Sequence, residues 1–343
     1  MRVLVATDFL EGWSGSEIMA LEVAEHFGAV ATSYWGQTPA KSELENWRPI
    51  EEIDLGEFDL VWAQHHVLLT LLNKLDGDHR PFVIWATLSP YDDMEQIPPS
   101  LIKEYVDIAV ANSAETAKAR GLEISFENAA PRKFHFEREQ RTLKNILFVS
   151  NNQPDEMLEA ASLLKRKGHT LRFIGRDREV KRIEPADIAW ADCVVTIGKT
   201  VRYALASGTP VFLYDRFGGD GYVTDENYAL NAEFNFSGRP NERRLSAQVL
   251  VDEIVAQHGY PVLPPQPVFE DFLDKLAGQA TPQPFKRIDD LRANAAMADS
   301  IGQWLIKCRS ESVIQSHAKG YRKAAGQFVR QKAPQWMQRL LLP

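Results

Sequence analysis

Short apolar runs recur along the chain, and most are followed by residues at helical spacing or by polar turn residues. Such runs predict buried parallel strands, because strands covered by helices on both faces need no alternation of polar and apolar positions. Strands that alternate with helices predict a parallel α/β sheet in each half of the chain. We expect strands at 2–7, 29–35, 58–64, 81–87, 107–112, 146–150, 171–174, 193–197 and 211–214, and helices later at 243–258 and 268–276.

The clearest single unit spans residues 191–222. An apolar strand at 193–197 is followed by the turn Gly198-Lys199-Thr200 and by apolar residues at helical spacing. Gly208 ends that helix and a second strand follows at 211–214. The unit is a right-handed βαβ crossover.

The glycine turn of this unit leads into a helix N-terminus, where free N–H groups and the helix dipole favour an anion. Lys199 and Arg202 add positive charge there. The glycine-dense segment 215–221 follows the second strand as a loop at the carboxyl edge, where α/β sheets bind ligands. The segment predicts a site for a phosphate-bearing ligand; the alternative is a plain βαβ unit with ordinary turn glycines.

Length and composition limit the class of protein. A chain of 343 residues with 44% hydrophobic and 25% charged residues is long enough for two soluble domains. The formal net charge of −8 argues against a general nucleic-acid binder. Two cysteines, Cys193 and Cys308, give neither a disulfide framework nor a metal cluster. With no signal peptide and no apolar run of transmembrane length, we expect a cytoplasmic protein.

Polar residues follow several predicted strands of the first half. The loop after the first strand contains Gly15, Ser16 and Glu17, which suit a helix start as well as a binding loop. It lacks a full G-x-G-x-x-G, so a dinucleotide site is not supported. The strand at 58–64 ends at His65-His66, at the edge where ligands bind.

The strand at 81–87 leads into an acidic loop. Asp92, Asp93 and Glu95 are candidate bases in this loop, and Ser89 and Tyr91 lie beside them. A solvated turn is the simpler interpretation of any one of these acids.

The pattern resembles GT-B glycosyltransferases, in particular a divergent family-4-like member. The resemblance rests on Gly198, on the A-S-G-T-P-V string at 206–211, on the glycines at 218–222, on the Gly-Ser-Glu at 15–17, and on FDLVWAQHH at 58–66. It implies an α/β fold of two Rossmann-like doubly wound domains that face a cleft, with a helical C-terminal extension. The implied domains are 1–135 on the acceptor side, 136–305 on the nucleotide-sugar side and a basic tail at 306–343, with one late helix crossing back onto the first domain.

Three departures separate this chain from the family pattern. Ala86-Thr87 stands where many members have a histidine, and Asn151-Asn152 stands where many have an arginine and a lysine. The usual pair of glutamates is replaced by Val195 and Tyr203. The resemblance therefore concerns the fold and the cleft, and not the standard retaining set of residues.

The resemblance implies transfer of a sugar from a nucleotide-sugar to a glycan or lipid-linked acceptor hydroxyl, in surface polysaccharide synthesis, without metal or cofactor. The rival interpretations are a non-catalytic nucleotide-sugar-binding module and a sugar-nucleotide epimerase of the same fold. Candidates for the catalytic base are Glu17, His65, Asp92 and Glu95, and acceptor-side candidates are Gly15, Ser16, Ser89 and Tyr91. Donor-binding candidates are Gly198, Lys199, Thr200, Arg202, Arg216, Gly218, Gly219, Tyr222 and Glu226, of which Glu226 suits a helix N-terminus equally well.

The C-terminal tail differs in charge from the rest of the chain. Residues 309–343 contain seven Lys or Arg against one acid, a net +6, so the remainder carries −14. Aromatic and aliphatic residues interleave with these cations, among them Tyr321, Phe328 and Trp336. A basic amphipathic helix of this composition suits the inner face of an anionic membrane, and it equally suits packing on the acidic body of its own protein.

Overall fold

The computed structural model describes residues 1–10, 13–35, 46–75, 79–92, 95, 97, 99–126, 128–176, 178–280 and 283–284. Asp93 and the expected basic tail at 306–343 lie outside the described residues. No helix in the described part of the chain is both long and apolar enough to cross a membrane.

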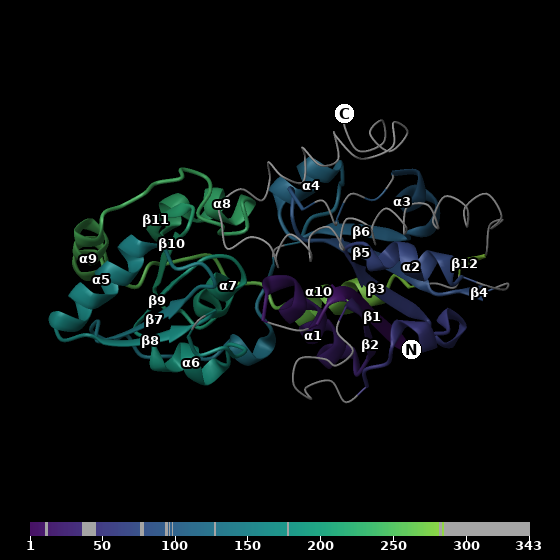
Figure 1. Cartoon of the computed structure of the whole chain (residues 1–343), viewed down its shortest axis with the longest axis horizontal. Helices are drawn as coiled ribbons and strands as arrows, with labels where there is room; N and C mark the ends of the chain where they lie inside the picture. Colours follow the sequence, from purple (N-terminus) through teal and green to yellow (C-terminus); the bar gives the residue numbers. More distant parts are fainter. Residues whose placement is uncertain are drawn as a thin grey trace, which may run out of the picture.

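Two five-stranded sheets form the centres of two α/β domains (Figure 1). The first sheet is wholly parallel, with the order β2-β1-β3-β5-β6 and the strands β1 (Val3–Phe9), β2 (Val30–Trp35), β3 (Leu60–Gln64), β5 (Phe82–Thr87) and β6 (Ile108–Ala111). The second has the order β11-β10-β9-β7-β8, with the strands β7 (Asn145–Val149), β8 (Thr170–Ile174), β9 (Cys193–Thr196), β10 (Val211–Asp215) and β11 (Gly218–Tyr222). A separate two-stranded ribbon pairs β4 (His79–Arg80) with β12 (Gln283–Pro284).

Both sheets reverse their strand order beside their first strand. In the first sheet β1 lies between β2 and β3, and in the second β7 lies between β8 and β9. This is the doubly wound arrangement, and the fold class expected from the sequence is confirmed. Ligands of such sheets bind outside the carboxyl ends of the strands at the point where the order reverses. The switch points of this protein are therefore β1/β3 and β7/β9.

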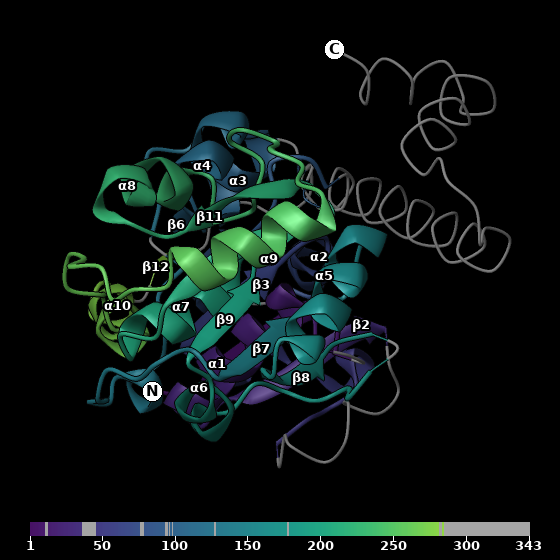
Figure 2. The same cartoon turned by 90° about the vertical axis from the view of Figure 1, so that its left-hand side faces the viewer.

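Helices cover both faces of each sheet (Figures 1 and 2). Four helices follow strands of the first sheet: α1 (Gly15–Phe27), α2 (Val67–Asn73), α3 (Pro99–Tyr105) and α4 (Ala114–Arg120). The others are α5 (Asp155–Arg166), α6 (Pro185–Trp190), α7 (Lys199–Ala206), α8 (Asp225–Glu233), α9 (Ala247–Ala256) and α10 (Phe269–Ala277). The side chains of α6 and α7 bury one face of the second sheet, and those of α5 and α9 bury the other.

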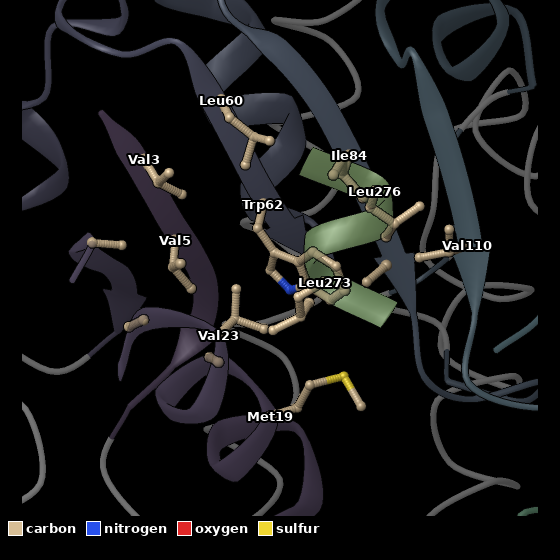
Figure 3. Close-up of a cluster of buried hydrophobic side chains, with 14 of the residues drawn as sticks. Val3, Val5, Met19, Val23, Leu60, Trp62, Ile84, Val110, Leu273 and Leu276 are labelled. Atoms are coloured by element: carbon tan, nitrogen blue, oxygen red, sulfur yellow. The ribbon is translucent and has the colours of Figure 1, made fainter. Parts of the chain in front are cut away.

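Helix α10 follows the second sheet in the chain but packs on the first. Leu273 and Leu276 of α10 lie in one buried cluster with Val5, Trp62 and Ile84 of the first sheet (Figure 3). Phe126, just beyond the first sheet, stacks on Phe272 with ring centroids 4.6 Å apart. A late helix therefore does cross back onto the first domain.

Most predicted elements are present, and two differ. The segment 215–221, expected as a loop, forms the end of β10 and the antiparallel edge strand β11, because its glycines let the backbone lie against β10 and its neighbours. The helix expected from residue 243 begins at Ala247, where Ser246 caps it by accepting from the backbone N–H of Val249. Arg243 instead lies in the loop before the helix, where its side chain pairs with Glu253 of α9.

Candidate functional site

The two domains lie side by side, with α1 of the first and α7 of the second at the junction between them (Figure 1). Helix α1, which follows β1, contacts α7, which follows β9: Ile18 of α1 lies in the same buried cluster as Val201 and Tyr203 of α7. Tyr203 also stacks on Phe134 with ring centroids 3.9 Å apart. This packing holds the two switch points on opposite sides of one junction.

The first switch point contains a buried acid and a buried imidazole. Asp8 ends the buried part of β1 and accepts from the backbone N–H groups of Val67, at 2.7 Å, and His66, at 3.3 Å. His65 follows β3 with φ of +60°, a conformation uncommon for a residue with a side chain. Backbone strain of this kind concentrates at functional sites.

Glu95 fixes the His65 ring. Its Oε1 lies 2.9 Å from Nδ1 of His65, and both side chains are buried. The same carboxylate accepts from the hydroxyl of Thr87 and from the backbone N–H groups of Leu88 and Ser89. With all its acceptor positions engaged, Glu95 orients His65 and has no free lone pair with which to act as a base.

The surroundings set the charge of these groups. Burial alone would lower the pKa of His65, but the contact with Glu95 and the charges of Asp8 and Asp92 raise it to about 9. Burial raises the pKa of Asp8 to about 7. Burial and the positive charge of His65 lower the pKa of His66 to about 4. At neutral pH the pair His65–Glu95 is therefore an imidazolium held by a carboxylate, and His66 beside it is neutral.

The other first-domain candidates divide between structural and accessible positions. Glu17 is buried and closes a capping box with Ser14, so its carboxylate serves the start of α1. Gly15 is exposed and Ser16 half-buried on the first turn of α1, near the junction. Asp92 is half-buried and close enough to His65 to influence its pKa.

Ser89 and Tyr91 shape the loop that carries Asp92. The hydroxyl of Ser89 accepts from the backbone N–H groups of Tyr91 and Asp92, each at 3.2 Å. Tyr91 is exposed and donates its hydroxyl to Glu115. The structure thus brings His65, Asp92, Glu95, Ser89 and Tyr91 together at one sheet edge.

Lys199 and Arg202 do not lie on a free surface. Lys199 is 6% exposed, and its Nζ lies 2.7 Å from Oε2 of Glu22 and 3.0 Å from Oδ1 of Asn128. Arg202 is 2% exposed and donates to the hydroxyl of Tyr228 at 2.8 Å. Burial raises the pKa of Glu22 and lowers that of Lys199. The expectation that these two cations face a phosphate is corrected: both are used inside the protein.

Three glycine-loop candidates are also structural. A Cβ on Gly218 would lie 2.3 Å from the carbonyl oxygen of Arg243, and one on Gly219 would lie 1.9 Å from that of Leu213. Tyr222 is buried and donates its hydroxyl to the carbonyl oxygen of Ile254 at 2.8 Å. These residues allow β11 to pack, so the expected ligand loop is corrected to an edge strand.

The remaining donor-side candidates lie at the sheet edge. Gly198 is the N-cap of α7 with φ of +68°, and Thr200 is buried in its first turn. Arg216 follows β10 and is exposed. Glu226 is exposed in the first turn of α8, well suited to the helix dipole.

Four residues at the junction were not singled out from the sequence. Asp8 directly follows the predicted apolar strand at 2–7, so its place at the sheet edge was predictable from the sequence. Asp215 likewise ends β10, where it is 3% exposed and accepts from the hydroxyl of Ser150 at 3.1 Å. Arg239 pairs with Glu115 from one domain to the other, and no local pattern marks that pair.

Comparison with known proteins gives limited information. No protein-family model matches the chain, and no curated protein matches it. A solved structure of T4 phage BGT in complex with its UDP-glucose substrate is similar with a TM-score of 0.36 and 10% identity, over 88% of this chain and 98% of that chain. A TM-score this low carries no argument about the function of this chain.

Proposed function

We propose that this protein is a glycosyltransferase that moves a sugar from a nucleotide-sugar donor to an acceptor hydroxyl, with the donor on the second domain and the acceptor on the first. One observation carries the proposal. Helices α1 and α7, which follow strands at the two switch points, pack against each other across one junction, and the first switch point bears a buried acid–imidazolium cluster beside a partly exposed acid. A transfer between two bound molecules needs two binding edges close together, and the α1–α7 packing brings two such edges to one junction.

The first-domain groups suit distinct tasks in such a transfer. Among the four candidate bases, all of which lie in the described part of the chain, only Asp92 is partly exposed. Its carboxylate lies at the sheet edge, so we assign it to deprotonating the acceptor hydroxyl. The His65 imidazolium, oriented by Glu95, would donate a hydrogen bond from Nε2 to an oxygen that gains negative charge. Arginines of the second domain would balance the leaving diphosphate, so the proposed transfer is metal-independent.

The acceptor and the setting are the finer parts of this proposal. A glycan or lipid-linked acceptor at an anionic membrane surface would suit the segregated positive charge at 309–343. Cosedimentation with anionic vesicles of the full chain and of a chain ending at Ser310 tests this setting. Equal binding by both chains, or by neither at low salt, would remove the membrane from the proposal.

The reaction is tested by incubating the full chain with UDP-, GDP-, ADP- and TDP-sugars and measuring released nucleotide and altered sugar. Slow donor hydrolysis that is lost in Asp92→Asn supports the transferase. Tight binding of a nucleotide-sugar without turnover would indicate a binding module, and an isomerised sugar would indicate an epimerase. Either result would replace the proposal.

A further inference from the structure

Three loops at the second switch point are joined by hydrogen bonds. Asp215, at the end of β10, accepts from the hydroxyl of Ser150, which follows β7, at 3.1 Å. The Ser150 hydroxyl in turn accepts from the backbone N–H of Asn152 at 3.0 Å. The loop after β7 is therefore fixed to the end of β10, although β9 lies between these two strands in the sheet.

The loop after β8 is fixed to the same place. The backbone N–H of Arg176 donates to Oδ1 of Asn151 at 2.9 Å. Gly175 has φ of +140°, and a Cβ there would lie 2.0 Å from the carbonyl oxygen of Ser150. Both the positive φ and this close approach require glycine at position 175. Together with the hydrogen bond to Asn151, they fix the backbone of Arg176.

Two exposed cations lie on this frame. Arg176 and Arg216 are exposed, and neither guanidinium forms an ion pair with a carboxylate among the residues that the structure describes. By contrast, Arg182, Arg239 and Arg243 each pair with a glutamate.

Arg216 lies at the domain junction. Its guanidinium carbon lies 4.5 Å from the centroid of the Phe217 ring, and Arg239 contacts the same ring at 6.0 Å. Arg239 in turn reaches Glu115 of the first domain. Arg216 is therefore close to the first domain and not on a remote surface of the second.

The strand order places the two cations on opposite sides of the switch point. The strands β8, β7, β9 and β10 are consecutive, and neighbouring strands lie about 4.8 Å apart, so the loops after β8 and β10 lie about 14 Å apart. Long arginine side chains from both loops can converge on an anion that lies between them, outside β7 and β9. A guanidinium forms two parallel hydrogen bonds with a phosphate group, which makes two of them suited to a diphosphate.

We propose that Arg176 and Arg216 form a two-sided binding site for the diphosphate of a nucleotide ligand, and that Asp215 positions it through Ser150 and Arg216. The part of this proposal that gives the ligand an attached sugar rests on the proposed function. Asp215 is a positioning residue, because its carboxylate is buried and engaged with the Ser150 hydroxyl and the backbone N–H of Arg216. The site replaces Lys199 and Arg202 as the source of positive charge at this edge.

The test measures binding of UDP, GDP, ADP and inorganic pyrophosphate to the full chain by calorimetry at low salt. Arg176→Gln and Arg216→Gln should each lower the affinity for the best-bound nucleotide by about 10- to 100-fold, the loss expected for one charge-assisted contact. Arg243→Gln is the matched control, since it removes an arginine of the same domain that is already paired with Glu253. It should leave affinity within about twofold.

A second arm tests Asp215 by coupling. Asp215→Asn alone should weaken binding of the nucleotide, and in the Arg216→Gln background it should add less than its single effect, because part of its action passes through Arg216. A purely structural role would instead give equal losses in both backgrounds. Thermal melting of each variant shows whether it remains folded.

The outcomes separate this site from the proposed reaction. Nucleotide binding that survives both Arg176→Gln and Arg216→Gln unchanged overturns this site and leaves a transferase possible with another donor site. Binding of nucleotides that depends on both arginines, in a protein that never turns over a nucleotide-sugar, supports the site and overturns the transferase. No binding of any of the four probes by the wild-type chain overturns this site, and the nucleotide-sugar panel then decides the transferase separately.

Discussion

Lys199 of α7 and Glu22 of α1 form an ion pair across the domain junction, with Nζ and Oε2 2.7 Å apart and both side chains almost wholly buried. The hydroxyl of Tyr203 also donates to Glu22. The glycine turn before α7 therefore brings its lysine to the neighbouring domain and not to a ligand.

This pair makes a stability prediction. Lys199→Met should destabilise the protein by about 3–5 kcal/mol, because it leaves the Glu22 carboxylate buried without its cation. The double variant Glu22→Leu/Lys199→Met should recover much of that loss. Urea unfolding measures both, with Lys165→Met on the exposed side of α5 as a control. A Lys199→Met protein as stable as the control would show that the ion pair is not maintained in solution.

The pKa of His65 is predicted to depend on Glu95. Glu95→Gln removes the negative charge next to Nδ1, so the pKa should fall from about 9 to well below its ordinary value of 6.5 as burial dominates. NMR titration of the His65 ring measures this directly. Glu104→Gln on α3 provides a control at an exposed acid of the same domain. An unchanged titration in Glu95→Gln would mean that Glu95 does not hold the ring.

The raised pKa of His65 also predicts that the protein loses stability at alkaline pH. Because the pKa of His65 is raised on folding from 6.5 to about 9, its contribution is complete below pH 6.5 and is lost as pH rises through 9. The loss amounts to about 3 kcal/mol, taken from the size of the shift. Unfolding free energies measured at pH 6 and pH 9.5 should differ by this amount in the wild type and by much less in His65→Gln. Equal differences in the two proteins would contradict the assignment.

Asp92→Asn is predicted to reduce catalysis without affecting folding. If Asp92 takes the acceptor proton, its loss should lower kcat by about 10²- to 10⁴-fold, with little change in donor affinity. Glu123→Gln, at an exposed acid of the same domain, should be silent. Steady-state kinetics with the donor found in the nucleotide-sugar panel provides the measurement. A change confined to donor KM would move the base to another residue.

Glycine 219 is predicted to be indispensable for packing. The Cβ of Gly219→Ala would lie 1.9 Å from the carbonyl oxygen of Leu213, so β11 must shift, at a cost of about 3 kcal/mol or more. Gly15→Ala is a control, because nothing lies within 4 Å of its added Cβ. Thermal unfolding compares the two. Equal melting temperatures would show that β11 can move away from β10 at little cost.

The strands were largely predictable because each is a continuous apolar run whose burial depends on residues within the run. The run at 211–214, for example, became β10 with every residue buried. The role of the glycines at 218–221 was not predictable, because it depends on carbonyl groups of Arg243 and Leu213 that meet them only in the folded chain.

The site was predictable at one sheet edge and not at the other. His65 and Glu95 lie close to the strands that position them, so sequence order indicated their edge. The pairing of Lys199 with Glu22 joins helices of different domains, and a lysine after a glycine carries no mark of whether it meets a phosphate or a glutamate.

The crossing of α10 onto the first sheet has a consequence for how the protein is made. Leu273 and Leu276 complete the core around Trp62, yet a ribosome releases them only after the whole second sheet has emerged. The first domain would therefore have an uncovered apolar face until the second domain and α10 have been synthesised. A gene divided near residue 140 should yield an N-terminal half that aggregates, and coexpressing it with residues 141–343 should return it to the soluble fraction.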